Sequence, residues 1–228
     1  MKIVAVIPAY NEASRVGAVV HAVRQYVDHI VVVDDGSLDA TSAVAGAAGA
    51  IVVRHPENTG AGAATMTGIE AARALGADTI VTIDADEQHD PKDIPALLEP
   101  VLDLRADVVF ANRFGPTSLG KHRNRIPAIR RLFNSIGNVV TFLAAGLWVR
   151  DSQCGFKAFG PKALREVHLQ TRGFEFCTEI IKEAHAHRWR IVEVPVKVVY
   201  SAYTLAKGQS FAMGVKTAFQ ILLRSFLR

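Results

Sequence analysis

Three short apolar runs, each followed closely by polar or acidic residues, constrain the fold of this chain most strongly. They lie at 3–7, 30–33 and 80–83 and are rich in Val and Ile. Such runs are typical of strands that are buried on both faces, as in parallel sheets. Helices are expected at 13–26, 39–48 and 92–103, and another runs from the small-residue loop at 58–64 to about residue 75. Further strands are expected at 50–53 and 107–111. This alternation predicts an α/β fold with a mostly parallel sheet and helices on both faces.

The second half of the chain is less regular. We expect helices at 129–149, 161–168 and 175–187 and a short strand at 155–159. The alternating stretch 191–199 contains Pro195, which favours an edge strand. The tail from Phe211 has apolar residues at helical spacing among Lys and Arg, which predicts a basic amphipathic helix that docks on the core or lies on a membrane. The expected division is a domain at 1–200 and a loop with this helix at 201–228.

Composition limits the class of protein. The 228 residues are half hydrophobic, which suits one domain with a sizeable core. No apolar run reaches 18 residues, so no transmembrane helix is expected, and the apolar start reads as a strand rather than a signal peptide. Cys154 and Cys177 are expected to be reduced thiols of a cytosolic protein.

The charge is divided unevenly along the chain. Residues 1–110 hold 7 Lys and Arg against 16 Asp and Glu, whereas residues 111–228 hold 19 against 6. The acidic half suits a bound cation, and the basic half suits phosphates, a membrane surface or nucleic acid. Charges spread over solvated surface are the plainer explanation, but they account less well for the asymmetry.

The strand at 80–83 leads into the most informative loop. Asp84, Asp86 and Gln88 follow it, and Asp90 with Pro91 reads as the capped start of a helix. Hard oxygen ligands at this spacing suit Mg²⁺ or Mn²⁺, although an acidic turn capping a helix explains them equally well.

Two other polar loops join this one at the same edge of a parallel sheet. They are Asn11-Glu12 and Asp34-Asp35, and the carboxyl edge is where open α/β sheets bind ligands. A nucleotide with a metal ion and phosphates is the natural occupant, with Asp35 accepting hydrogen bonds from base or ribose. The loop at Gly60 and Gly62 either approaches a ligand or packs closely. The dinucleotide fingerprint and the P-loop pattern are both absent.

Four motifs in this order resemble family 2 glycosyltransferases, over roughly residues 1–200. The nearest branch is the dolichol-phosphate mannosyltransferase-like group of polyprenyl-phosphate sugar synthases. The motifs are Pro8-Ala9-Tyr10-Asn11-Glu12, Val33-Asp34-Asp35-Gly36-Ser37, Asp84-Ala85-Asp86 and Asp151-Ser152-Gln153-Cys154-Gly155-Phe156-Lys157. The resemblance implies a GT-A fold, with a Rossmann-like sheet, and a nucleotide-diphosphate sugar donor.

The resemblance also implies site residues. The metal ligands are Asp84, Asp86 and Gln88, and the catalytic residues are Asp86, Arg113 and Gln153. The nucleotide and donor are bound by Pro8, Tyr10, Glu12, Asp35, Asp84, Ala85, Lys207 and Ser210. Glu87 departs from the usual Gly of the metal motif, and Tyr200-Ser201-Ala202-Tyr203 departs from the mannosyltransferases, so UDP- and GDP-sugars both stay open as donors.

The implied reaction is an inverting, metal-dependent transfer of the sugar to a polyprenyl or dolichyl phosphate. Such a phosphate is already an anion near neutral pH and needs no strong base. A hydroxyl acceptor would need one, with Asp151 and Glu179 as the candidates. The basic run 121–131 is expected to bind the lipid phosphate through Arg123, Arg125 and Arg131. Helix 129–149 and the tail would then touch the cytoplasmic face of a membrane peripherally.

Two alternatives remain open. One is the same donor chemistry with a soluble sugar or small-molecule acceptor. The other is a non-catalytic basic module that binds anionic membrane or nucleic acid. Nucleic acid is not expected, because the basic segment lacks the interleaved aromatic residues of single-strand binders.

Overall fold

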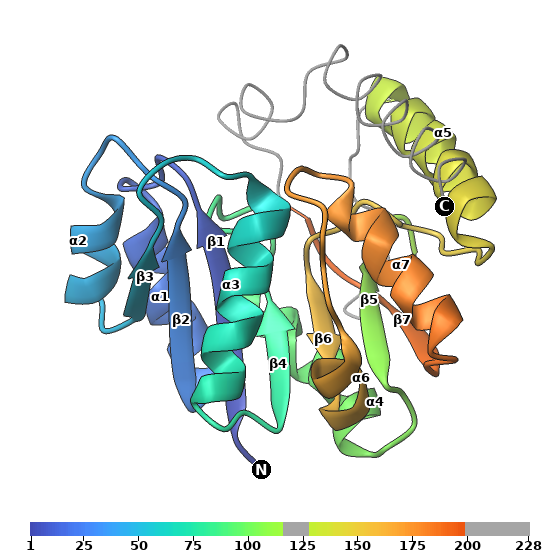
Figure 1. The fold of residues 1–228 in the computed structure, drawn as a ribbon, viewed down its shortest axis with the longest axis horizontal. Coiled ribbons are helices and arrows are strands. Elements are labelled where there is room, and N and C mark those ends of the chain that lie inside the picture. The colour runs from blue at the N-terminus through green and yellow to red at the C-terminus, as the bar shows by residue number, and fades with distance from the viewer. Residues whose placement is uncertain (116–127, 199–228) are drawn as a thin grey trace.

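A seven-stranded mixed sheet organises the protein (Figure 1). The computed structural model describes residues 1–115 and 128–198. The strand order is β3-β2-β1-β4-β6-β5-β7. The strands are β1 (Ile3–Ala9), β2 (His29–Asp34), β3 (Ile51–Arg54), β4 (Thr79–Thr82), β5 (Val108–Asn112), β6 (Lys157–Phe159) and β7 (Ile191–Pro195). All neighbours are parallel except β6, which runs antiparallel to β4 and β5.

Helices cover both faces of the sheet, as Figure 1 shows. One face carries α1 (Val16–Val23), α2 (Thr41–Ala47) and α4 (Ile94–Leu102). The other carries α3 (Ala61–Ala74), α6 (Pro161–Glu166) and α7 (Phe176–Ala186), with α5 (Ala128–Ala145) packed on α7. Short 3₁₀ turns are η1 (Arg24–Tyr26) and η2 (Pro91–Asp93).

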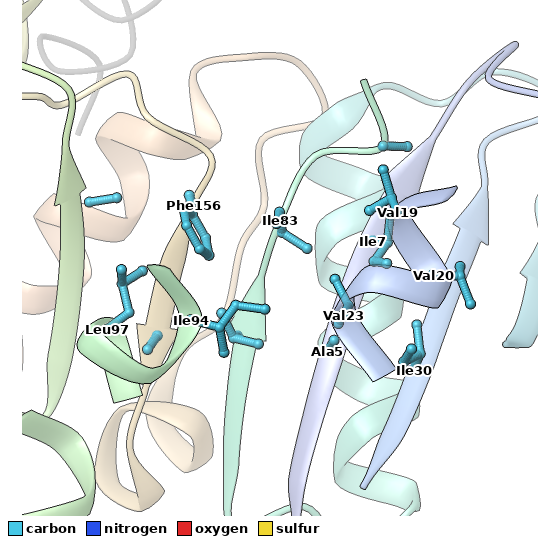
Figure 2. Packing of buried hydrophobic residues seen from close by; sticks show 14 of the residues in the cluster. Ala5, Ile7, Val19, Val20, Val23, Ile30, Ile83, Ile94, Leu97 and Phe156 are labelled. Carbon is cyan, nitrogen blue, oxygen red and sulfur yellow. The ribbon is translucent and has the colours of Figure 1, made fainter. Parts of the chain in front are cut away.

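Burial on both faces explains why β1 is apolar throughout. Ala5 and Ile7 point into the core under α1 and α4, part of which Figure 2 shows. Val4 and Val6 point into the second core, under α3 and α7. A residue on either face of this strand is therefore removed from water, which the sequence pattern predicted.

The expected elements form close to their predicted places. Pro195 does lie in an edge strand, since β7 ends the sheet. Asp90 caps η2 by accepting a hydrogen bond from the Lys92 amide at 3.1 Å. Helix α5 ends at Ala145, short of the expected 149, because Gly146 adopts a left-handed φ of 72°.

Three further expectations concern the cysteines, membrane-spanning helices and the C-terminal tail. Both cysteines are free thiols, as predicted. Within residues 1–115 and 128–198, no helix is long and apolar enough to span a membrane. The predicted C-terminal amphipathic helix lies outside the described residues.

Candidate active site

The predicted meeting of three loops at one sheet edge is confirmed. β1 lies between β2 and β4 and is parallel to both, so the loops after all three strands emerge on the same side. The Asp35 amide donates to the Ala9 carbonyl at 2.9 Å, which joins the first two loops directly.

The loop after β1 is held against the loop after β2 by hydrogen bonds. Asn11 donates its amide to Ser37 Oγ and accepts from the Leu38 amide, both at 2.8 Å. The Glu12 amide donates to Thr41 Oγ1 at 2.8 Å. These bonds fix the loop after β1, in which Glu12 is buried and Tyr10 is exposed.

Asp35 organises the adjoining loop. Its carboxylate accepts from the Thr59 amide and hydroxyl, at 2.9 and 2.7 Å, and from the Gly60 amide at 2.8 Å. His55 Nδ1 lies 2.7 Å away. Burial alone would raise the pKa of Asp35, but these hydrogen bonds outweigh it and hold the pKa below its ordinary value. The carboxylate is thus fixed and charged beside the predicted nucleotide pocket.

The loop at Gly60 and Gly62 packs closely against the 171–173 segment. Of the two alternatives for this loop, approach to a ligand or close packing, the structure shows close packing. The Gly62 amide donates to the Arg172 carbonyl at 2.8 Å. A Cβ at Gly60 or Gly62 would lie 2.3 Å from a backbone oxygen of the 171–173 segment. This helix N-terminus is therefore occupied by protein rather than open to a ligand.

Asp84 and Asp86 fit a divalent cation. The pKa of Asp84 is raised by burial and by the neighbouring Asp86 charge, so the two carboxylates lie close enough to repel each other. The Asp84 side chain is still 41% exposed, and Asp86 accepts from the Gln88 amide at 3.0 Å in a tight turn. A bound cation would relieve this repulsion with the hard oxygen ligands that Mg²⁺ and Mn²⁺ prefer. Among the described residues, the Asp84–Asp86 edge included, no group of three or more His, Cys, Asp or Glu is arranged to hold a metal ion.

Gly155 and His89 both lie against the Asp84 carboxylate. A Cβ at Gly155 would lie 2.8 Å from both of its carboxylate oxygens, so only glycine fits there. His89, buried and 5.1 Å from the Phe156 ring centroid, lies 3.8 Å from Asp84 on another side. Next to Asp86, Glu87 has a left-handed φ of 60° and forms an ion pair with Arg15.

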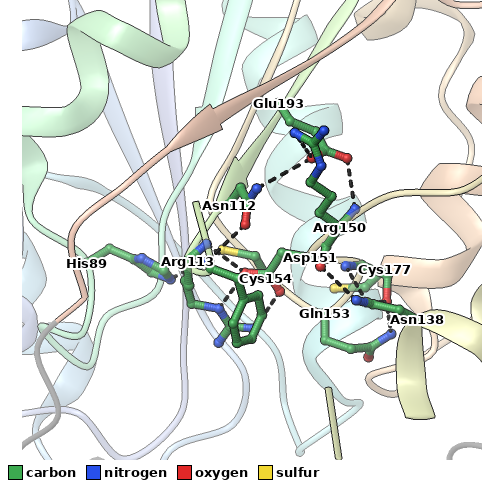
Figure 3. Close-up of polar contacts among 12 residues, drawn as sticks. His89, Asn112, Arg113, Asn138, Arg150, Asp151, Gln153, Cys154, Cys177 and Glu193 are labelled. Atoms are coloured by element: carbon green, nitrogen blue, oxygen red, sulfur yellow. Dashed lines mark hydrogen bonds and ion pairs between the residues drawn. The ribbon is translucent and has the colours of Figure 1, made fainter. Parts of the chain in front are cut away.

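Arg113 lies at the end of β5 and is held by Asp151. Its Nε and Nη2 donate to the two oxygens of that carboxylate at 2.7 and 2.8 Å, and its amide donates at 2.9 Å (Figure 3). The Asp151 side chain is fully buried. The guanidinium charge opposes, without cancelling, the rise in the pKa of Asp84.

Gln153 faces a different direction. Its amide donates to Ser152 Oγ at 3.1 Å and Thr141 Oγ1 at 3.3 Å, and it packs against Gly137 of α5. Asn138 of α5 accepts from Ser152, so this loop is tied to α5 (Figure 3). Gln153 therefore lies on the α5 side, and no contact joins it to Asp84 or Asp86 within the described part of the chain.

The two candidate bases for a hydroxyl acceptor are both committed elsewhere. Asp151 accepts three hydrogen bonds from Arg113. Glu179 accepts from the Gln170 and Thr171 amides and from the Thr171 hydroxyl. Neither carboxylate is placed to take a proton from a substrate.

The remaining predicted residues divide between described and undescribed parts. Pro8 lies in the last part of strand β1, Ala85 lies on the loop after β4, and Arg131 is exposed on α5. Arg123, Arg125, Lys207 and Ser210 fall outside the described residues. Sequence reasoning gave no role to Lys157, although a lysine in the apolar stretch 154–159 was a visible signal.

Comparisons with known proteins identify a family and several relatives of this chain. The model of glycosyl transferase family 2 matches residues 4–167. The UDP-N-acetylglucosamine–dolichyl-phosphate N-acetylglucosaminyltransferase of Methanococcus voltae is 33% identical over 238 residues, covering 96% of this chain and 94% of that protein. The polyprenol monophosphomannose synthase of Mycolicibacterium smegmatis is 31% identical over 204 residues, covering 84% and 75%.

Solved structures confirm the predicted fold. Glucosyl-3-phosphoglycerate synthase from Mycobacterium tuberculosis, in complex with Mg²⁺ and UDP, superimposes with a TM-score of 0.75 at 21% identity, covering 98% of this chain and 79% of that one. The same enzyme with Mn²⁺, UDP and product gives a TM-score of 0.69 at 23% identity.

Proposed function

We propose a specific reaction for this chain, which belongs to glycosyl transferase family 2. It transfers a sugar from a nucleotide-diphosphate donor to a polyprenyl or dolichyl phosphate, with inversion at the anomeric carbon. Relatives named for dolichyl- and polyprenyl-phosphate acceptors cover most of the chain and support this acceptor class. The reaction takes place at the cytoplasmic face of a membrane, which the protein contacts peripherally.

The donor lies along the carboxyl edge of β1, β2 and β4. Tyr10 and Glu12 form one wall of the nucleotide pocket, with Asp35 and Pro8 beside it. Asp84, Asp86 and Gln88 would hold the divalent cation, which when bound neutralises charge on the diphosphate leaving group. UDP with Mg²⁺ or Mn²⁺ in one enzyme of the same fold supports this occupant.

On the acceptor side of the site, the protein positions the reacting groups and does not take a proton from the acceptor. Arg113 adds positive charge near Asp84, and its orientation is fixed by Asp151. Because both candidate bases are engaged by protein partners, an acceptor that is already anionic fits the site better than a hydroxyl. This is the observation that carries the choice of a lipid phosphate over a soluble alcohol.

Helix α5 supplies the surface for the lipid. Arg131 near its start would meet the phosphate, together with Arg123 and Arg125. An apolar strip of exposed side chains runs along α5 and past its end. It comprises Leu132, Phe133, Ile136, Val139, Phe142, Leu143 and Trp148. A strip of this size beside basic residues is typical of helices that lie in a membrane interface.

Transfer to a lipid phosphate tests the proposal. The protein is incubated with UDP-N-acetylglucosamine or GDP-mannose and a polyprenyl phosphate in detergent, with Mn²⁺, Mg²⁺ or a chelator. We expect an inverted, lipid-linked sugar from one donor, and none with chelator. Asp86→Asn should lower the rate by roughly a hundredfold or more. Asp90→Asn, which alters only the cap of η2, is the matched control and should retain the rate.

Two results would contradict the proposal. Transfer to a soluble phosphorylated sugar acceptor, with none to the lipid, would contradict the acceptor class. Absence of transfer from every donor by the folded protein would contradict the reaction itself.

Co-sedimentation with anionic liposomes tests the membrane contact separately. Ile136→Glu and Leu143→Glu change the exposed strip on α5 and should weaken liposome binding while nucleotide binding is unchanged. Leu38→Glu changes an exposed leucine on the loop after β2 and is the control. Unchanged liposome binding by the α5 variants would assign the contact to another surface.

A further inference from the structure

Lys157 is an unusual residue in this core. It begins β6, and its side chain is completely buried. The ammonium nitrogen lies 5.6 Å from the Phe110 ring centroid and 5.7 Å from that of Phe176. A lysine is almost never fully buried unless its charge is compensated.

Its direct partners are neutral. The ammonium donates to the Cys154 carbonyl and lies 3.5 Å from Cys177 Sγ. Within residues 1–115 and 128–198, no carboxylate lies within ion-pair distance of it. Two aromatic faces and one carbonyl stabilise a cation only in part, so a nearby negative charge is expected.

The sheet register brings that charge close. β6 is antiparallel to β4, and Thr82 pairs with Lys157. Continuing this antiparallel direction, Asp84 comes beside Gly155, whose missing side chain leaves room for the carboxylate. The Lys157 ammonium donates to the carbonyl of Cys154, the residue before Gly155, so its positive charge lies on the same turn that Asp84 contacts.

We propose that Lys157 is a positioning residue for donor binding, with two effects. Its ammonium holds the Cys154 carbonyl, which fixes the Asp151–Gly155 loop between Arg113 and the cation site. Its charge lies behind Asp84 and favours a cation bound together with a nucleoside diphosphate over the cation alone. The inference rests on the proposed donor site.

The two charges of the ligand make a signed prediction. A buried positive charge repels a lone divalent cation and attracts the diphosphate that arrives with it. Lys157→Met keeps the length of the side chain but removes the charge. It should therefore bind Mn²⁺ alone more tightly and bind UDP in saturating Mn²⁺ more weakly, each by roughly tenfold. A side chain that only filled space would weaken both or neither.

Calorimetric titration measures both affinities, first with Mn²⁺ alone and then with UDP in saturating Mn²⁺. All variants are titrated in the same buffer at the same pH. Lys157→Arg retains the charge and should restore the ratio of the two affinities toward that of the wild type. Lys162→Met removes a lysine of α6 far from this loop and is the matched control.

Each outcome is decisive. If the wild type binds neither Mn²⁺ nor UDP, the proposed donor site fails and the inference fails with it. If the wild type binds both and Lys157→Met shifts both affinities in the same direction, or neither, the donor site stands and the role of Lys157 is wrong. Opposite shifts support it.

A double-mutant cycle keeps the test valid if Lys157→Met does not fold. The proposal predicts that Asp84→Asn with Lys157→Met folds, because both members of the charge pair are then removed. Where Lys157→Met does fold, the proposal also predicts that its loss of melting temperature is smaller in the Asp84→Asn background. An unfolded double variant, or equal losses in both backgrounds, would overturn the pairing of these two charges.

Discussion

The two halves of the sheet solve the problem of buried polar groups differently. In the first half, β1 to β4, the acidic loops are held by neutral donors, as Asp35 is by Thr59 and Gly60. In the second half, β5 to β7, the buried Asp151 meets the charged Arg113, although the direct partners of the buried Lys157 are neutral. Carboxylates held by neutral donors keep their negative charge, so this edge of the sheet suits a bound cation. A carboxylate paired with an arginine is fixed in place but its charge is already neutralised.

The largest expected effect is in the second half. Asp151→Asn leaves the Arg113 guanidinium buried without its counter-charge, which should lower the free energy of unfolding by about 3–5 kcal/mol. Urea denaturation measures this loss. Replacing both residues, Asp151→Leu with Arg113→Met, should recover part of the stability while transfer stays lost. A loss from Asp151→Asn below about 1 kcal/mol would show that the pair is not rigid.

A smaller effect is expected in the first half. Asp35→Asn replaces one accepting oxygen by a donor and leaves one of the Thr59 and Gly60 donors unsatisfied, at a cost of about 1–3 kcal/mol. Nucleotide binding should weaken with it, because the 55–60 loop is no longer fixed. Asp28→Asn, at an exposed loop, is the control for thermal melting. If Asp35→Asn cost as much as Asp151→Asn, the contrast between the halves would fail.

Both halves contain a carboxylate whose pKa is lowered, but the donors differ: neutral groups at Asp35 and an arginine at Asp107. The Arg190 hydrogen bonds lower the pKa of Asp107 below its ordinary value of about 3.9, so this carboxylate stabilises the fold above that pH. The contribution is lost as the pH falls through the lowered pKa. Arg190→Met should make the acid side of the stability curve less steep, which melting curves taken between neutral and acidic pH would measure. An unchanged curve would remove Asp107 from the acid response.

The smallest effect concerns Glu87. Its left-handed backbone costs about 1 kcal/mol relative to glycine, and its exposed ion pair with Arg15 returns at most a similar amount. Glu87→Gly should therefore shift the melting temperature by no more than about 4 °C. A larger fall in melting temperature would mean that the ion pair with Arg15 fixes the loop from Asp84 to Gln88. The first half of the sheet would then also rely on paired charges, as the second half does at Asp151.

Sequence reasoning predicted the first half well because its signals are local. Each strand and the loop after it are contiguous, so the shared edge of Glu12, Asp35 and Asp84 followed from the parallel order alone. The second half depends on partners far apart in the chain. Nothing near Lys157 shows that β6 inserts antiparallel between β4 and β5, and nothing near Gly62 shows that the Arg172 carbonyl meets it. The pairing of Asp151 with Arg113 was not predicted either, because the two residues are far apart in the chain.

Cation-dependent nucleotide binding tests the central claim most directly. Melting temperatures are measured with UDP and with GDP, each with and without Mn²⁺, for the wild type and Asp86→Asn. The account predicts a rise with one nucleotide that requires Mn²⁺, amounting to about 2.7 kcal/mol of stabilisation at a hundredfold excess over Kd, and its loss in the variant. A rise of the same size without Mn²⁺ or in Asp86→Asn, or no rise with either nucleotide, would contradict a donor site at the Asp84–Asp86 edge.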